Sequence, residues 1–165
     1  MSAVGWALGT FHTSVVGIAL LLLVYPGGGL SVALGGLSTI SDLALFGALW
    51  STTVYSTGRA TRGLRLLGAD RAASGAFYRR ALRWGAANGV LFFVALVVIV
   101  VTNAVVTAPP GAPSVQIGAI LPIAALEVGL GTMVAFAIGA LLGLVLATLD
   151  LVALRIARAV VGPTA

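Results

Sequence analysis

The sequence predicts an all-α fold: a polytopic membrane protein whose four helices form a transmembrane bundle, with a basic amphipathic helix on the cytoplasmic side. Three observations predict this class. Of the 165 residues, 60% are hydrophobic and 8% are charged, whereas a soluble domain has about 25% charged residues. Four apolar stretches reach the length of about 20 residues that crosses a bilayer. All 9 basic residues are arginines, and they occupy only two regions of the chain.

The same composition excludes several classes of protein. A soluble enzyme, a nucleic-acid-binding domain or a disordered tail needs many more charged residues than this chain has. The formal net charge of +5 would suggest a nucleic-acid partner for a soluble protein, but the clustering of the arginines points to membrane topology instead. Cysteine and lysine are absent, so disulfides and thiolate metal sites are excluded, and the residue usage suggests a prokaryotic source.

A single transmembrane domain over residues 1–165 accounts for the four stretches, and each of them ends at a helix breaker or an arginine. The predicted spans are about 4–25, 37–58, 85–106 and 129–154. The breakers are Pro26-Gly27-Gly28-Gly29 and the Pro109–Pro113 segment, and the arginines are Arg59 and Arg155. We expect the first span to be retained rather than cleaved as a signal peptide, because no basic residue precedes it.

Two of the apolar stretches are longer than a simple span requires. The stretch 30–58 holds 29 residues and the stretch 115–154 holds 40, which as one helix would be about 60 Å long. Segments 30–41 and 115–128 therefore lie in the interface, re-enter the membrane or belong to strongly tilted spans. The natural positions for breaks are Gly35-Gly36 and Gly129-Leu130-Gly131.

The distribution of the arginines predicts the orientation of the bundle. Seven of them lie between Arg59 and Arg83, and the other two are Arg155 and Arg158. With four spans, the 59–84 loop and the C-terminal tail lie on the same side of the membrane, and the positive-inside rule makes this side cytoplasmic. We therefore expect a multi-pass protein of the cell membrane with both termini in the cytoplasm.

The cytoplasmic loop 59–84 contains an expected helix that begins near Asp70, a favourable N-cap residue. Three arginines lie on one face of this helix, opposite an apolar face. They are Arg79, Arg80 and Arg83. A basic amphipathic helix of this kind can lie on the inner leaflet and bind anionic lipid. The alternative is that it forms a helical lead-in to the third span.

Ionisable groups inside a membrane are costly, so each one is a functional candidate by default. If the first hairpin turns tightly at residues 26–29, His12 and Asp42 lie at equal depth, where they can hydrogen-bond and relay protons. In the competing register the second span begins near Leu37, and Ser38 or Asp42 caps it at the outer interface. The sequence leaves both registers open.

Glu127 lies on the same helical stripe as a ridge of small residues at four-residue spacing. This small-residue ridge consists of Gly131, Ala135, Gly139, Gly143 and Ala147. Such a pattern lets another helix approach closely, and Gly85 and Gly89 form a shorter copy of it. Glu127 should therefore face protein, where it hydrogen-bonds across the bundle or forms a cation or proton site at the outer mouth.

The remaining polar residues favour packing over catalysis. We expect Asn88 and Asn103 to hydrogen-bond between helices at the two ends of the third span. We expect Asp150 to form a local ion pair with Arg155 or to anchor the helix end at the interface. A lone histidine cannot form a multi-histidine metal or haem site, and a phosphate loop would need a lysine. We therefore expect no catalytic centre, no metal and no cofactor.

The sequence favours a non-catalytic scaffold, or a subunit of a membrane complex or homo-oligomer, that assembles in the lipid bilayer through the small-residue ridge. The alternative is a transporter or channel subunit for protons, ions or a small solute, with His12, Asp42 and Glu127 as its intramembrane polar residues. Neither the substrate nor the partner follows from the sequence.

Overall fold

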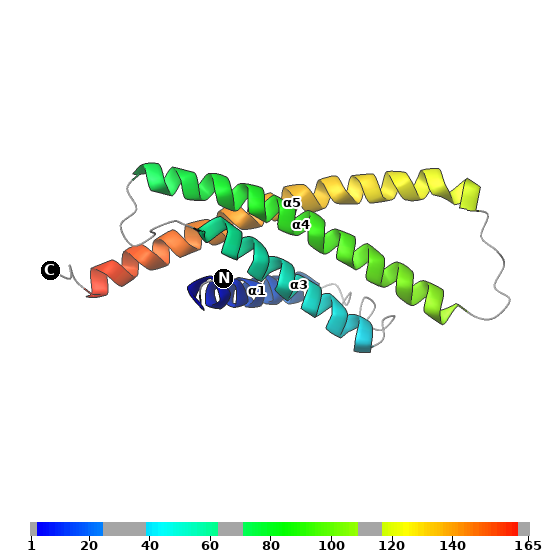
Figure 1. Ribbon diagram of the computed structural model, residues 1–165, viewed down its shortest axis with the longest axis horizontal. Coiled ribbons are helices and arrows are strands. Elements are labelled where there is room, and N and C mark those ends of the chain that lie inside the picture. The colour runs from blue at the N-terminus through cyan, green and yellow to red at the C-terminus, as the bar shows by residue number, and fades with distance from the viewer. Residues whose placement is uncertain (1–2, 25–38, 63–70, 109–116, 162–165) are drawn as a thin grey trace.

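The computed structural model describes residues 3–24, 39–62, 71–108 and 117–161. The elements in this part of the chain are helices: α1 (Ala3–Val24), α3 (Thr39–Thr61), α4 (Arg71–Thr107) and α5 (Ile117–Val161) (Figure 1). The predicted all-α class is thus confirmed. The breaks expected at Pro26–Gly29, Gly35-Gly36 and Pro109–Pro113 lie outside the described residues, as does the candidate cap Ser38.

The two longest helices, α4 and α5, cross near the middle of the molecule and run in opposite directions (Figure 1). Their contact is made by glycines on both sides. A Cβ atom on Gly85 would lie 2.8 Å from Cα of Gly143, and one on Gly139 would lie 2.9 Å from Cα of Gly89. Side chains larger than hydrogen would therefore push the helices apart. The small-residue ridge of α5 is occupied by α4 of the same chain.

The two shorter helices lie on one side of the α4–α5 pair (Figure 1), with α3 packed on α4 and α1 packed on α3. α1 approaches α3 closely at Gly9, where an added Cβ atom would lie 2.6 Å from Cα of Val54. Beside this contact the rings of Trp6 and Trp50 meet edge to face, with their centroids 6.3 Å apart. Helices that follow one another in the sequence therefore pack against one another.

Both long helices continue where the sequence suggested interruptions. α5 runs unbroken through Pro122 and through the break expected at Gly129-Leu130-Gly131. A glycine inside a helix costs only about 1 kcal/mol relative to alanine, and Gly131 packs against the ring of Phe93 on α4. In the same way α4 extends without a break from Arg71 to Thr107. Its basic first part is therefore the lead-in to the apolar part and not a separate helix.

The described arginines gather toward one end of the molecule. The start of α1, the end of α3, the start of α4 and the end of α5 all lie toward the left of Figure 1. These helix ends carry Arg59, Arg80 and Arg155, among others. The Arg80 guanidinium donates a hydrogen bond of 2.7 Å to the backbone carbonyl of Arg62, which ties α4 to the end of α3.

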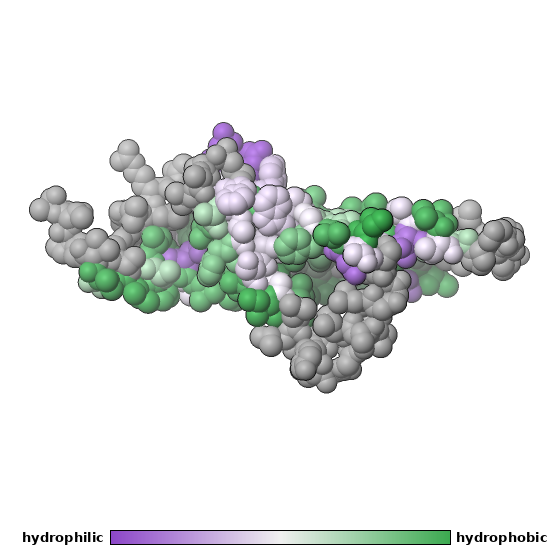
Figure 2. Space-filling view, turned by 90° about the horizontal axis from the view of Figure 1, so that it is seen from below, coloured by the Kyte–Doolittle hydropathy of each residue, from purple (hydrophilic) through white to green (hydrophobic). Residues whose placement is uncertain are grey.

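Most large apolar side chains lie on the surface. The buried apolar cluster is small and consists of Phe77, Ala81 and Ala147, with Tyr78 and Leu151 packed against it. Hydrophobic residues are spread over the face seen in Figure 2, where strongly hydrophilic ones form only small patches. By length and composition, two described segments suit a membrane crossing, Ser74–Thr107 and Pro122–Ile156, and a shorter apolar segment covers Gly5–Leu20. α3 is less apolar because serine and threonine recur along it.

Candidate functional site: a polar pair at a cavity between four helices

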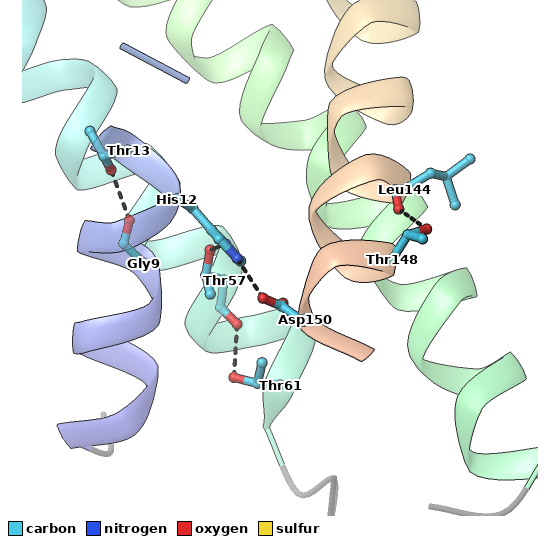
Figure 3. A network of polar contacts seen from close by, with 8 residues as sticks. All are labelled: Gly9, His12, Thr13, Thr57, Thr61, Leu144, Thr148 and Asp150. Atoms are coloured by element: carbon cyan, nitrogen blue, oxygen red, sulfur yellow. Dashed lines mark hydrogen bonds and ion pairs between the residues drawn. The ribbon is translucent and has the colours of Figure 1, made fainter. Parts of the chain in front are cut away.

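A buried polar pair joins the first helix to the last. Nε2 of His12 on α1 lies 3.0 Å from Oδ1 of Asp150 on α5, and Nδ1 of His12 lies 3.2 Å from Oγ1 of Thr57 on α3 (Figure 3). The exposed fraction is 5% for His12 and 7% for Asp150. A hydroxyl, an imidazole and a carboxylate therefore form a continuous chain across three helices.

Each of these three polar residues lies about one helical turn after a residue at which two helices pack closely. His12 follows Gly9, and Thr57 follows Val54, by three residues each; Gly9 and Val54 form the α1–α3 contact. Asp150 follows Ala147, which is buried in the apolar cluster of α4 and α5, by the same interval. Because residues three apart lie on nearly the same helix face, the close contacts direct all three polar side chains inward.

Hydrogen-bond complementarity indicates the tautomer of His12. Nε2–H donates to the carboxylate of Asp150, which has no proton to give when ionised. In a neutral ring Nδ1 is then the acceptor, and the hydroxyl of Thr57 donates to it. An imidazolium would instead donate from both nitrogens, to the Asp150 carboxylate and to the hydroxyl oxygen of Thr57. In either form of the ring, His12 contacts only Oδ1 of Asp150, and Oδ2 is left without a partner.

His12, Thr57 and Asp150 lie along the wall of a partly open cavity of about 350 Å³ that is lined by α1, α3, α4 and α5. One end of the cavity is polar, with His12, Thr57 and Asp150 in its lining; the other is apolar, with Leu96 and Val134. From Asp150 to Val134 the wall follows 16 residues of α5, or about 24 Å of helix. The volume falls within the range of roughly 300–1,000 Å³ typical of small-molecule sites.

Two polar atoms of cavity-lining residues have no hydrogen-bond partner in the described part of the chain. They are Oδ2 of Asp150 and Oδ1 of Asn88. The amide nitrogen of Asn88 does have one, because Nδ2 donates to Oγ1 of Thr53 over 3.3 Å. A buried acceptor without a partner costs about 1–3 kcal/mol, and more when it is charged. The cavity therefore presents acceptors that a ligand with hydrogen-bond donors would satisfy.

His12 contacts Asp150 and Thr57, not Asp42, with which the tight-hairpin register would pair it. Asp42 lies in the first turn of α3, where the helix dipole favours an acidic residue. Its Oδ1 is buried without a partner, but Asp42 does not line the cavity. Glu127 is exposed on α5, away from the cavity lining.

The expected local ion pair between Asp150 and Arg155 is wrong, because Asp150 forms its ion pair with His12. Residues five apart on a helix point in different directions, whereas residues three or four apart are neighbours. Sequence reasoning therefore missed Asp150 and Thr57 as parts of one site. The only signal for them was the presence of an acid and a hydroxyl near the ends of predicted spans.

The helix-to-helix hydrogen bonds expected of the two asparagines are confirmed. Asn88 bonds to Thr53, and Oδ1 of Asn103 accepts a 3.2 Å hydrogen bond from the hydroxyl of Ser41, so both tie α4 to α3. Arg79 and Arg83 are exposed on α4 beside Arg80. In the described residues, histidines and acids do not cluster in threes as a metal site would require.

Arg59, at the end of α3, covers two aromatic rings. Its guanidinium carbon lies 5.2 Å from the ring centroid of Tyr55 and 5.8 Å from that of Trp84. Both distances are typical of a cation–π interaction. Trp84 also lines the cavity, so the contact holds a cation just outside the wall of the site.

Comparison with known proteins places the whole chain in one family. No curated protein and no solved structure matches the chain significantly. The chain belongs to DUF7965, a family of unknown function, whose profile matches residues 1–165.

Proposed function

We propose that the chain is an integral membrane protein whose four helices cross the bilayer. The surface supports this proposal, because large apolar side chains such as Phe46, Met133 and Leu141 are more than 60% exposed. Monomeric soluble proteins rarely expose continuous apolar surface on this scale, whereas lipid covers it at no cost. α3 and α1 then cross beside the two longer helices and complete the bundle.

The arginine-rich end is cytoplasmic in this proposal. Positive charge concentrates on the cytoplasmic side of membrane proteins, and the ends of α3 and α5 and the start of α4 all point to this end (Figure 1). Both termini are then cytoplasmic. Exposed Arg79 and Arg83 lie where they can bind anionic headgroups of the inner leaflet.

Within the membrane, the protein binds a small solute between its helices and acts as a transporter or channel subunit. The observation that carries this proposal is the cavity of about 350 Å³ with a buried carboxylate whose Oδ2 has no partner. Polar groups inside membranes usually line paths for substrates, ions or protons. In a proton path, water in the cavity would protonate Oγ1 of Thr57 as its hydroxyl proton moves to Nδ1 of His12 and the proton on Nε2 moves to the Asp150 carboxylate.

Accessibility of the cavity to water-soluble reagents tests this function. The chain has no cysteine, so a single introduced thiol reports without background. Ser56 lines the cavity, whereas Ala86 is 2% exposed and does not. A small cationic methanethiosulfonate reagent should modify Ser56→Cys in proteoliposomes and leave Ala86→Cys unmodified. Equal protection of both thiols would contradict a solute path.

Measurements of proton flux test which acidic residue lies on the proton path. Protein in liposomes with an internal pH dye should conduct protons under an imposed potential, and Asp150→Asn should reduce that flux at least tenfold. Asp42→Asn and Glu127→Gln are the matched controls, because neither residue lines the cavity. Flux that persists in Asp150→Asn would remove this acid from the path.

A second candidate function is that of a subunit in a membrane assembly. The first half of α5 favours it, because Leu126, Leu130 and Met133 are exposed there in one apolar stretch. The small-residue ridge does not supply this interface, since α4 of the same chain occupies it. Leu126→Cys and Leu130→Cys should then form cross-links between copies in membranes, whereas Leu20→Cys on α1 should not.

A further inference from the structure

The cavity is asymmetric along its length, which restricts the shape of its ligand. His12, Thr57 and Asp150 line it near the arginine-rich end, and Leu20, Leu96 and Val134 line it farther along their helices. Leu20 lies eight residues beyond His12 on α1, or about 12 Å along the helix. A ligand that fills the cavity therefore has a polar head at one end and a long apolar body.

The charge at the polar end restricts the head group. Oδ1 of the Asp150 carboxylate lies against Nε2 of His12, whereas its other oxygen, Oδ2, has no partner among the described residues. The described residues that line the cavity include no arginine. A buried carboxylate oxygen without a hydrogen-bond partner is costly, and a cationic donor in contact with it offsets that cost.

Resting on the proposed function, we propose that the cavity binds a linear amphiphile with a primary ammonium head, such as a long-chain alkylamine in its charged form. The ammonium donates to Oδ2 of Asp150, and the alkyl chain runs along the apolar wall in the direction of Val134. An ammonium has three donors, so it can also donate to a hydroxyl of the polar wall, such as that of Ser56. The orientation places the head near the cytoplasmic interface and the chain toward the bilayer centre.

A matched set of three probes tests the head group. Dodecylammonium, dodecanol and dodecanoate share one alkyl chain and differ in charge, so titration into zwitterionic nanodiscs with and without the protein separates binding from partition into lipid. We expect dodecylammonium to bind at least tenfold more tightly than the other two. Equal affinity for all three, or a preference for dodecanoate, would overturn the proposal.

Two variants assign the preference to the cavity. Asp150→Asn keeps an oxygen that accepts from His12 and removes the charge, so it should abolish the preference for dodecylammonium; Asp42→Asn, outside the cavity, should keep it. A preference that survives in Asp150→Asn would also overturn the proposal. Circular dichroism and the melting temperature establish that each variant is folded, and Asp150→Glu should restore the preference.

A third variant separates this proposal from the broader function. Leu142→Trp fills the apolar part of the cavity eight residues before Asp150 on α5, or about 12 Å along the helix, and it should weaken all three probes together. If the three probes bind equally and Leu142→Trp weakens them, the cavity binds solutes but the ammonium preference is wrong. If no probe binds above the level of empty nanodiscs, both the preference and the solute-binding function fail.

Discussion

Nε2 of His12 lies 3.0 Å from Oδ1 of Asp150, and the two residues are 138 positions apart in the chain. Their helices, α1 and α5, share little other backbone contact, because α1 packs mainly on α3 and α5 mainly on α4. The pair therefore lines the polar end of the cavity and joins the first helix to the last (Figure 3).

Removal of one partner should destabilise the bundle more than removal of both. His12→Leu leaves the Asp150 carboxylate buried without its hydrogen bond, and loss of one partner of a buried ion pair costs about 3–5 kcal/mol. The double variant His12→Leu/Asp150→Leu should recover most of that loss. Unfolding in mild detergent, analysed as a double-mutant cycle, measures the coupling. Strictly additive losses would show that the pair does not couple the two helices.

The Gly9–Val54 contact should be intolerant of any larger side chain. Gly9→Leu must displace the α3 backbone, because even a Cβ atom would lie 2.6 Å from Cα of Val54; overpacking of this kind costs about 1–3 kcal/mol. Gly17 on the same helix has open space around it, and Gly17→Leu should be neutral or stabilising. The melting temperatures of the two variants make the comparison, and equal values would argue against the close approach of α1 to α3.

The site depends on close contacts between helices, and this dependence explains which of its features the sequence could predict. Four-residue spacing of small residues is visible in the sequence, so the ridge on α5 and its shorter copy at Gly85 and Gly89 are predictable. The sequence does not predict which helix packs on the ridge. Any helix with small residues, from this chain or from another copy, satisfies the pattern. The structure assigns it to α4.

The His12–Asp150 pair was beyond sequence reasoning for a geometric reason. A tight hairpin places residues at equal depth by counting from its turn, and this counting pairs His12 with Asp42. The helices instead cross where Gly9 meets Val54, which brings Thr57 to His12. The sequence also left open whether the basic part of α4 is a separate helix or the lead-in to the apolar part. Arginine is a good helix former in both cases.

Substitutions in the ridge should destabilise the single chain, because α4 of that same chain fills it. Gly139→Leu would force the α4 and α5 backbones apart at Gly89, so we expect a lower melting temperature and loss of folded protein. Gly129→Leu is the matched control on the same helix, since nothing lies near that position. Light scattering in detergent distinguishes the outcomes: a folded Gly139→Leu protein with a smaller oligomer would mean that the ridge joins separate copies.

The orientation of the bundle can be tested with single cysteines, which this cysteine-free chain accepts without background. Gly28→Cys and Ala112→Cys lie in the segments between the arginine-free helix ends, and Gly68→Cys and Thr164→Cys lie beside the arginine-rich ends. Because positive charge is retained in the cytoplasm, a membrane-impermeant maleimide should label the first two in intact cells and the last two only after permeabilisation. Labelling of Gly68→Cys and Ala112→Cys from the same side would contradict the four-span topology. Labelling of Gly68→Cys and Thr164→Cys alone in intact cells would invert it, and would place the polar end of the cavity at the outer face.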